Sequence, residues 1–329
     1  MPINARTCAL VLAAISTVAA CGSGTIMGGS APDAAGGNGD PPPPARGFQV
    51  TSPSVTIMPG QEVTYCYYFH TPNTETLVIK KWSSVMTPGS HHMIMYSSAT
   101  DAMPPGTLST AACGGFTGVD APSWTYSAQT PTNELALPTD DGTGLPLGQE
   151  ITAGTPAYFQ MHYLNATDAP IQAHVTLNAE AYDAGVPYTK TAAYVTYNGK
   201  ISIPPHAVGV VESMTCSVPA NLKFWLLSTH AHQQAVLTAI KDGPSTSTAI
   251  PFTSTDWQHP GTAMWMASPF YTFTTNQLTY ECTYNNTGPN AATTVVDGPS
   301  AVTNEMCMAT GYYFPATKPL LCINNIGPF

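Results

Sequence analysis

The chain of 329 residues is poor in charged side chains, which make up 9% of it, against about 25% in typical soluble domains. Arginine is nearly missing: Arg6 and Arg46 are the only two, so no guanidinium group follows residue 46. The formal net charge is −10, and the few cations form no basic cluster. A chain without a basic patch cannot displace counterions from phosphates, so nucleic acid is excluded as a partner.

Long apolar runs are also missing after the N-terminal segment, so nothing downstream is expected to span a membrane. The first 21 residues resemble a secretory signal, with Arg6 near the start, a short apolar core over residues 8–20 and small residues before Cys21. The run Val18-Ala19-Ala20-Cys21 resembles a bacterial lipobox, in which the cysteine is acylated and becomes the mature N-terminus. The alternative is an ordinary signal peptide with an incidental cysteine.

We therefore expect an exported protein that contacts a membrane only through a lipid on Cys21. Gly22, in place of aspartate, fits transfer to the outer membrane of a bacterium, with the folded part in the periplasm or outside the cell. Residues 22–47 are rich in Gly, Ala, Ser and Pro and end near a proline run at 41–44. This composition predicts a flexible tether with a stiff polyproline spacer, with ordered sequence from about Phe48.

Cysteine pairs of the CxxC type are absent, which argues against a structural zinc site or a dithiol redox site. Without Cys8 and Cys21, an even number of cysteines remains in an exported chain, and this predicts up to three disulfides among 15 connectivities. These cysteines are Cys66, Cys113, Cys216, Cys282, Cys307 and Cys322.

Helical periodicity is hard to find, and short runs rich in Val, Thr, Tyr and Phe recur between Pro, Gly, Asn and Asp. Such runs predict an all-β chain of the sandwich or jelly-roll type. A break at residues 183–187 divides it into two expected antiparallel domains, 48–185 and 186–329. The expected strands cover residues 63–69, 77–82, 93–96, 158–164, 171–177, 192–197, 208–214, 224–240 and 270–284.

Several histidines lie in strand-like segments. His230 and His232 flank Ala231, and residues i and i+2 of a strand point to the same face, as two ligands of one metal would. His91 and His92 are adjacent, so joint ligation requires a strand end or a bulge there. His162 lies in another strand-like stretch. The alternative for each is a hydrogen-bonded core histidine.

Four short motifs occur in a fixed order: His91-His92-Met93, Gln160-Met161-His162-Tyr163, His230-Ala231-His232 and Glu305-Met306-Cys307. In this order the chain, from about residue 48 to residue 322, resembles the copper type II, ascorbate-dependent monooxygenases, which include peptidylglycine α-hydroxylating monooxygenase and dopamine β-monooxygenase. The resemblance implies two copper-binding domains that face each other across a cleft.

The resemblance assigns His91, His92 and His162 to an electron-supplying copper, and His230, His232 and Met306 to the copper at which O₂ is activated. A soft thioether favours Cu(I), which agrees with a role for Met306, although methionine is also a common core residue. Gln160 matches a family residue that orients solvent or substrate between the metals. Its alternative is a plain polar strand residue.

The implied activity is hydroxylation of a C–H bond in a small organic substrate, with O₂ and with ascorbate or another one-electron reductant. We expect a monomer. The alternative function is a non-catalytic lipoprotein that binds or sequesters copper at the cell surface. A carbohydrate-binding or adhesion sandwich is disfavoured by the order of the motifs.

The cysteine pattern of the family implies the pairs Cys66–Cys113, Cys216–Cys322 and Cys282–Cys307. The last of these would fix the backbone beside Met306.

The substrate of the peptide-processing member does not carry over. That member holds a carboxylate with an arginine at the position of Ser228, and two polar contact residues of the family are replaced here by Met308 and Thr310. A site without a cationic fork does not grip a carboxylate in a bidentate way, so a neutral or apolar molecule, or a catechol-like amine, is expected. His70, His174 and His206 are expected to be ordinary surface or core residues, and His259 to lie in a loop.

Overall fold

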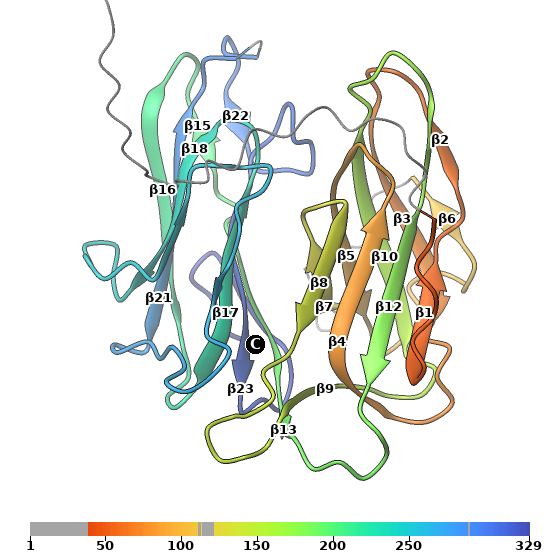
Figure 1. The fold of residues 1–329 in the computed structure, drawn as a ribbon. Coiled ribbons are helices and arrows are strands. Elements are labelled where there is room, and N and C mark those ends of the chain that lie inside the picture. The colour runs from red at the N-terminus through yellow and green to blue at the C-terminus, as the bar shows by residue number, and fades with distance from the viewer. Residues whose placement is uncertain (1–38, 111–112, 114–121, 289) are drawn as a thin grey trace, which may run out of the picture. The chain divides into compact units, whose positions relative to one another are not determined.

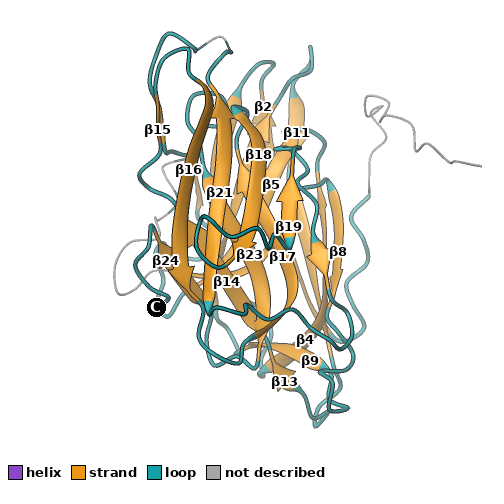
Figure 2. Ribbon diagram, turned by 90° about the vertical axis from the view of Figure 1, so that its left-hand side faces the viewer, coloured by secondary structure: helices purple, strands orange, loops and turns teal. Residues whose placement is uncertain are grey.

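The computed structural model describes residues 39–110, 113, 122–288 and 290–329. These residues form strands, turns and loops but no helix (Figures 1 and 2), which confirms the all-β prediction. Within them, therefore, no helix has the length and apolar character needed to cross a membrane. The signal-like segment and Cys21 lie outside the described residues.

The strands before residue 191 pair only with one another. One sheet has the order β1 (Gly47–Thr51), β12 (Val175–Ala181), β4 (Leu77–Met86), β9 (Leu147–Ile151) and β13 (Thr189–Lys190), with β8 (Thr132–Ala136) also on β4. A second has the order β6 (Leu108–Ser109), β3 (Glu62–His70), β10 (Pro156–Leu164), β5 (Ser90–Ser97) and β7 (Ser123–Ala128). A small third sheet joins β11 (Ile171–Ala173) to β2 (Val55–Ile57).

The strands after residue 191 also pair among themselves. One sheet has the order β20 (Ala263–Met264), β17 (Lys223–Ala231), β23 (Cys307–Phe314), β14 (Ala192–Tyr197) and β24 (Leu320–Ile323). Another has the order β16 (Val208–Ser217), β21 (Gln277–Asn285), β18 (Ala235–Asp242) and β19 (Phe252–Ser254), and β15 (Ser202–Ile203) pairs with β22 (Val295–Val296). Pairing is antiparallel except between β13 and β9 and between β14 and β24.

Three of the long expected strands are interrupted. The strand expected at residues 270–284 begins only at β21 (Gln277–Asn285), after a turn at residues 274–275. The expected strand 224–240 is two strands, β17 and β18, because the chain turns after Ala231 and the Ala235 N–H donates to the His232 carbonyl at 3.1 Å. The expected strand 171–177 divides at His174 into β11 and β12. A hydrophobic pattern does not mark the turn after Ala231, since His232 and Gln234 are polar but buried like the strand residues.

The two sets of strands share a hydrophobic core. The core of the first set extends to Trp225, Tyr312 and Phe314 of the second. Tyr312 Oη donates to the Thr125 carbonyl at 3.1 Å, so a buried hydrogen bond also joins the sets. β13, beyond the boundary expected between residues 185 and 186, still pairs with β9, and residues 38–329 cluster as one compact unit. The division into two domains stays a prediction.

The proline run at residues 41–44 makes hydrogen bonds to the first set of strands. The carbonyls of Pro41 and Pro42 accept hydrogen bonds from Gln49 Nε2 at 2.7 Å and Asn178 Nδ2 at 3.0 Å. A polyproline segment has no internal hydrogen bonds, so its carbonyls are open to such partners.

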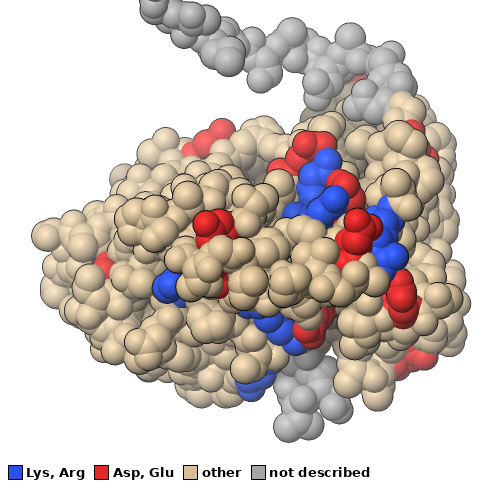
Figure 3. All heavy atoms as spheres, turned by 60° about the horizontal axis from the view of Figure 1, so that its bottom comes forward, with Lys and Arg blue, Asp and Glu red and all other residues tan. Residues whose placement is uncertain are grey.

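The disulfides join the cysteines that the resemblance pairs, namely Cys66–Cys113, Cys216–Cys322 and Cys282–Cys307. Charged side chains are sparse on the surface in Figure 3, and blue and red atoms often lie next to each other. The described residues form ion pairs such as Lys80–Glu180 and Lys241–Glu281.

Candidate metal centre

A bulge in β5 turns two adjacent histidines to the same side. β10 pairs His162 with His92 and Tyr163 with Ser90, so His91 is the extra residue of the bulge. Adjacent residues of a regular strand point to opposite faces, but a bulge places two residues against one and redirects a side chain. The imidazole centroids of His91 and His92 lie 5.0 Å apart, and each lies 5.2 Å from that of His162.

The second group of expected ligands lies at the end of the β17–β23 pair. In this antiparallel register His230 faces Met308 and Ala231 faces Cys307, so continuing it by one residue sets His232 opposite Met306. The rings of His230 and His232 lie 5.3 Å apart. The Cys282–Cys307 disulfide and a 2.8 Å hydrogen bond from Tyr284 Oη to the Met306 carbonyl hold this strand start.

Glu305 ties the two parts of that second group together. Its buried carboxylate accepts hydrogen bonds from the backbone N–H groups of His232 at 3.0 Å, Gln234 at 2.7 Å and Met306 at 3.2 Å. Burial raises the pKa of Glu305 to about 8, and the N–H donors oppose that rise. The turn after β17 and the start of β23 are therefore fixed to one side chain.

The five histidines form one cluster in this structure. The ring of His230 lies 5.4 Å from that of His91 and 5.0 Å from that of His92, as close as the rings within each expected group. His232 lies 5.8 Å from His91 and 6.3 Å from His162. One ligand atom from each of His91, His92 and His230 fits within 4.8 Å of the other two. The two expected ligand groups are thus in contact.

Each histidine of the cluster has one buried ring nitrogen without a hydrogen-bond partner in the described part of the chain. These atoms are His91 Nε2, His92 Nδ1, His162 Nδ1, His230 Nε2 and His232 Nε2. Buried polar atoms are normally paired, so five such atoms in one cluster call for a common partner. Imidazole nitrogens are good ligands of copper, and the residues present therefore fit a copper site.

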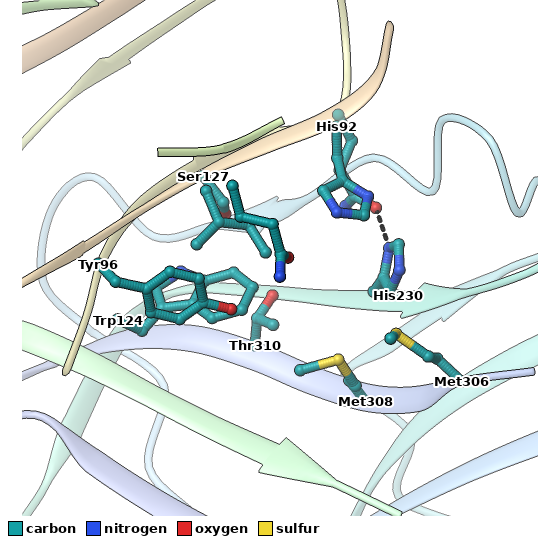
Figure 4. A pocket seen from close by; sticks show the side chains of 11 residues that line it. His92, Tyr96, Trp124, Ser127, His230, Met306, Met308 and Thr310 are labelled. Atoms are coloured by element: carbon teal, nitrogen blue, oxygen red, sulfur yellow. Dashed lines mark hydrogen bonds between the residues drawn. The ribbon is translucent and has the colours of Figure 1, made fainter. Parts of the chain in front are cut away.

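Three outer partners orient these rings. The Nδ1 of His230 lies 2.7 Å from Gln129 Oε1, the bond drawn in Figure 4. The Nδ1 of His232 lies 3.2 Å from the Asn304 carbonyl, and the Nε2 of His162 lies 2.9 Å from Glu62 Oε1. Each acceptor fixes the proton on the contacted nitrogen and leaves the other nitrogen as a ligand, as outer partners of metal-bound histidines do.

Glu62 links the cluster to the second set of strands. Its carboxylate also accepts hydrogen bonds from Ser300 Oγ at 2.8 Å and the Ala301 N–H at 2.7 Å. Burial raises the pKa of Glu62, but the hydrogen bonds from His162, Ser300 and Ala301 outweigh it and lower that pKa to about 2. An ionised Glu62 therefore joins His162 to the loop that precedes Met306.

The motifs pointed to neither Glu62 nor Gln129. Both lie far in sequence from the histidines they contact, and only strand pairing brings them near. Trp257 was also missed as a contact, and its ring lies 5.3 Å from that of His91. His259 lies in the same exposed loop. His70 and His206 are exposed, and the partly buried His174 lies 3.2 Å from Asp40.

The metal-free protein is expected to lose stability in acid. Burial lowers the pKa of His91 from 6.5 to about 3 and that of His232 to about 4, and it holds those of His92 and His230 well below the usual range. The unfolded chain binds more protons below pH 6.5, so stability is complete above that pH and falls as pH decreases toward the folded-state pKa values. The lowered pKa of His91 alone then reduces the free energy of unfolding at pH 5 by about 2 kcal/mol relative to neutral pH.

Chemical denaturation of chelator-treated protein at pH 7.5 and pH 5 measures this loss. A His91→Gln variant should show a smaller difference between the two pH values, and a variant of the exposed His70 should match the unmodified protein. Equal stability at both pH values would contradict the assignment of neutral, buried imidazoles.

A cavity adjoins the cluster, and we call it the inner chamber. It measures about 60 Å³, and its lining includes His92, His230, Met306 and Gln160 together with Tyr96 and Trp124. A second cavity of about 230 Å³, the outer chamber, is lined in part by Ser228, His259 and Tyr312. Of the positions expected to contact substrate, Met308 lines the inner chamber, Ser228 the outer one, and Thr310 both.

Comparison with known proteins finds a family model that matches the C-terminal part of the chain. The family model described as copper type II ascorbate-dependent monooxygenase, C-terminal domain, matches residues 182–328. This match confirms for these residues the resemblance seen in the motifs. A comparison with curated proteins finds no match.

Two solved structures align over much of the chain with little similarity. The major capsid protein P2 from Bacteriophage PM2 is 6% identical, with 81% of this chain and 97% of that chain covered and a TM-score of 0.31. The PBSX exported protein XepA is 8% identical, with 83% and 88% covered and a TM-score of 0.20. Likenesses this weak carry no conclusion about function.

Proposed function

Residues 182–328 match the C-terminal domain of the copper type II ascorbate-dependent monooxygenases, and from this we propose that the chain is a copper-dependent monooxygenase. Its reaction is the hydroxylation of a C–H bond in a small organic molecule, with O₂ and an external one-electron reductant such as ascorbate. The observation that carries the proposal is the cluster of five buried ring nitrogens without hydrogen-bond partners, next to a thioether and a cavity.

We propose two copper ions for each chain. His91, His92 and His162 hold one, and His230, His232 and Met306 hold the other. Copper, when bound, supplies one-electron redox chemistry toward O₂. The soft sulfur of Met306 favours Cu(I), whereas three imidazoles accept both oxidation states.

The protein's own part is to hold and orient the side chains that bind the metal ions. Glu62 and Gln129 set the tautomers of His162 and His230, and Glu305 fixes the spacing between His232 and Met306. Gln160 lines the inner chamber beside His92 and His230, where its amide can hold water or substrate.

Copper binding without turnover is the second candidate function. It is favoured by one observation: Ser228 stands where the peptide-processing relative has its substrate-anchoring arginine, and Ser228 Oγ donates to the Gly261 carbonyl at 2.6 Å. A sequestration protein would need the ligands but no substrate anchor.

Oxygen uptake separates the two functions. Copper-loaded protein with ascorbate is screened against candidate substrates for O₂ consumption that is coupled to hydroxylated product. Coupled uptake supports the monooxygenase. Stoichiometric copper binding with no substrate-dependent uptake across the screen would favour the binding protein.

Removing the side-chain amide of Gln129 is expected to weaken copper binding at His230. Loss of an outer partner of a metal-bound histidine typically costs about 10–100-fold in affinity, and Gln129→Ala should fall in this range. Competition with a Cu(I) chelator measures it. Gln172→Ala, at an exposed glutamine that contacts Thr56, serves as the control. Equal affinities of the two variants would show that Gln129 does not orient His230.

We also propose that Cys21 carries a lipid and anchors the protein to a bacterial membrane, on the periplasmic or the outer face. In the native host, Cys21→Ser should release the protein into the soluble fraction, and incorporation of labelled fatty acid should disappear. Unchanged membrane association would contradict the lipid anchor.

A further inference from the structure

We propose that the substrate of this site is an uncharged molecule with a flat apolar end, which reaches the metal ligands from the outer chamber through the inner chamber. The inference rests on the proposed function for the reaction, but the chemistry of the ligand is argued from the two chambers alone.

The inner chamber has two unlike ends. Figure 4 shows His92, His230 and the sulfur of Met306 at one end, and Tyr96 and Trp124 at the other. The rings of Tyr96 and Trp124 pack edge to face with centroids 5.6 Å apart, so they form a rigid apolar wall. Met308 lies between the two ends. A flat apolar group fits between this wall and the metal ligands.

The size of the inner chamber limits what it holds. Its volume of about 60 Å³ accommodates about four to six water molecules at roughly 10–15 Å³ each, and hence one small ring at most. The outer chamber is larger and shares the lining residues Trp124, Ser127, Gln129 and Thr310 with it. The two chambers therefore adjoin across these four side chains. The outer one reaches solvent beside the exposed residues His259 and Gly261.

Within the part of the chain that the structure describes, neither chamber is lined by a side chain of Asp, Glu, Lys or Arg that could pair with a charged substrate. A carboxylate or an ammonium group would lose its hydration here with no oppositely charged side chain to replace it. This excludes the amine that the sequence left open.

Neutral hydrogen-bonding groups are available instead. The side chains of Gln160, Ser127 and Thr310 make no hydrogen bond to another described residue, and all three line the inner chamber and are partly buried. A site with a mostly apolar lining and a few polar groups fixes the orientation of its ligand through those groups. The ligand therefore carries a hydroxyl, carbonyl or amide next to its apolar end.

A matched series of three compounds tests the inference that the ligand is uncharged. Phenylacetamide, phenylacetate and phenethylamine share one ring and differ in charge, and their binding to the copper-loaded full chain is followed by calorimetry. We expect the amide to bind at least ten-fold more tightly than either ion. An ion that binds as tightly as the amide, or no difference among the three, overturns the inference.

A plug between the chambers tests the route. Ser127→Phe, on the edge strand β7, should weaken binding of phenylacetamide at least ten-fold, whereas Ser123→Phe on the same strand, outside both linings, should change it less than two-fold. Equal binding by both variants, at unchanged copper content, overturns the route. The three compounds are compared on the unmodified chain, so they test whether the ligand is uncharged even if a variant fails to fold. Selective binding of the amide without coupled oxygen uptake would support this inference but contradict the proposed monooxygenase activity.

Discussion

Met306→Ile is expected to abolish substrate-coupled oxygen uptake while the copper at His91, His92 and His162 stays bound. Isoleucine is similar in size but offers no sulfur, so a soft ligand disappears and the packing is largely kept. Loss of an outer partner already costs about 10–100-fold, so loss of a direct ligand should lower the coupled rate by about two orders of magnitude or more. Oxygen electrode traces with product analysis give the coupled rate, and copper analysis gives the metal content.

The matched control is Met214→Ile in β16. Met214 is partly buried and packs against a separate hydrophobic cluster of the second set of strands, which includes Tyr280 and Tyr284 and none of the inner-chamber ligands. The control should keep both coppers and the full rate. A Met306→Ile variant that turns over at the unmodified rate would show that the thioether does not serve the reaction.

Copper is expected to raise the stability of the chain strongly. A metal ion that binds only the folded state raises the free energy of unfolding by about 4 kcal/mol for each site when its free concentration is about 1,000 times the Kd. Two sites therefore add about 8 kcal/mol. For a chain of this size, that corresponds to a rise in Tm on the order of 15 °C or more. Scanning calorimetry of chelator-treated and copper-loaded protein measures the change.

Single-ligand variants identify the source of this stabilisation. His162→Ala should lose the copper at His91 and His92, keep the other copper and show about half of the rise in Tm. His232→Ala should lose the copper at His230 and Met306 and also show about half of the rise. A variant of the exposed His206 should retain the full increase. If copper left the Tm of the unmodified protein unchanged, the cluster would not be a copper site.

The strands were predicted from local signals in the sequence, whereas the disulfide pairs were implied only by the family resemblance. Short β-rich runs between turn residues gave most of the strands, and the order of the motifs implied the cysteine pairs that the structure contains. Adjacency of His91 and His92 predicted a strand end or a bulge, and the structure has the bulge. For the strands and the bulge, a few neighbouring residues carry the information.

Other features depend on contacts that no local pattern encodes. Gln129 meets His230, and Glu62 meets Ala301, across separations of 101 and 239 residues. The contact between the two groups of histidines likewise follows from a core that runs from the first set of strands to Trp225 and Tyr312. The chain turn after Ala231 was missed because His232 and Gln234, although polar, are buried like the strand residues beside them.

X-ray absorption at the copper edge of the reduced, copper-loaded protein tests the central claim most directly, because it needs no substrate. The account predicts about two copper ions for each chain, imidazole scattering at both, and a sulfur scatterer that disappears in Met306→Ile. A chain that binds no copper, or a spectrum that Met306→Ile leaves unchanged, would contradict it.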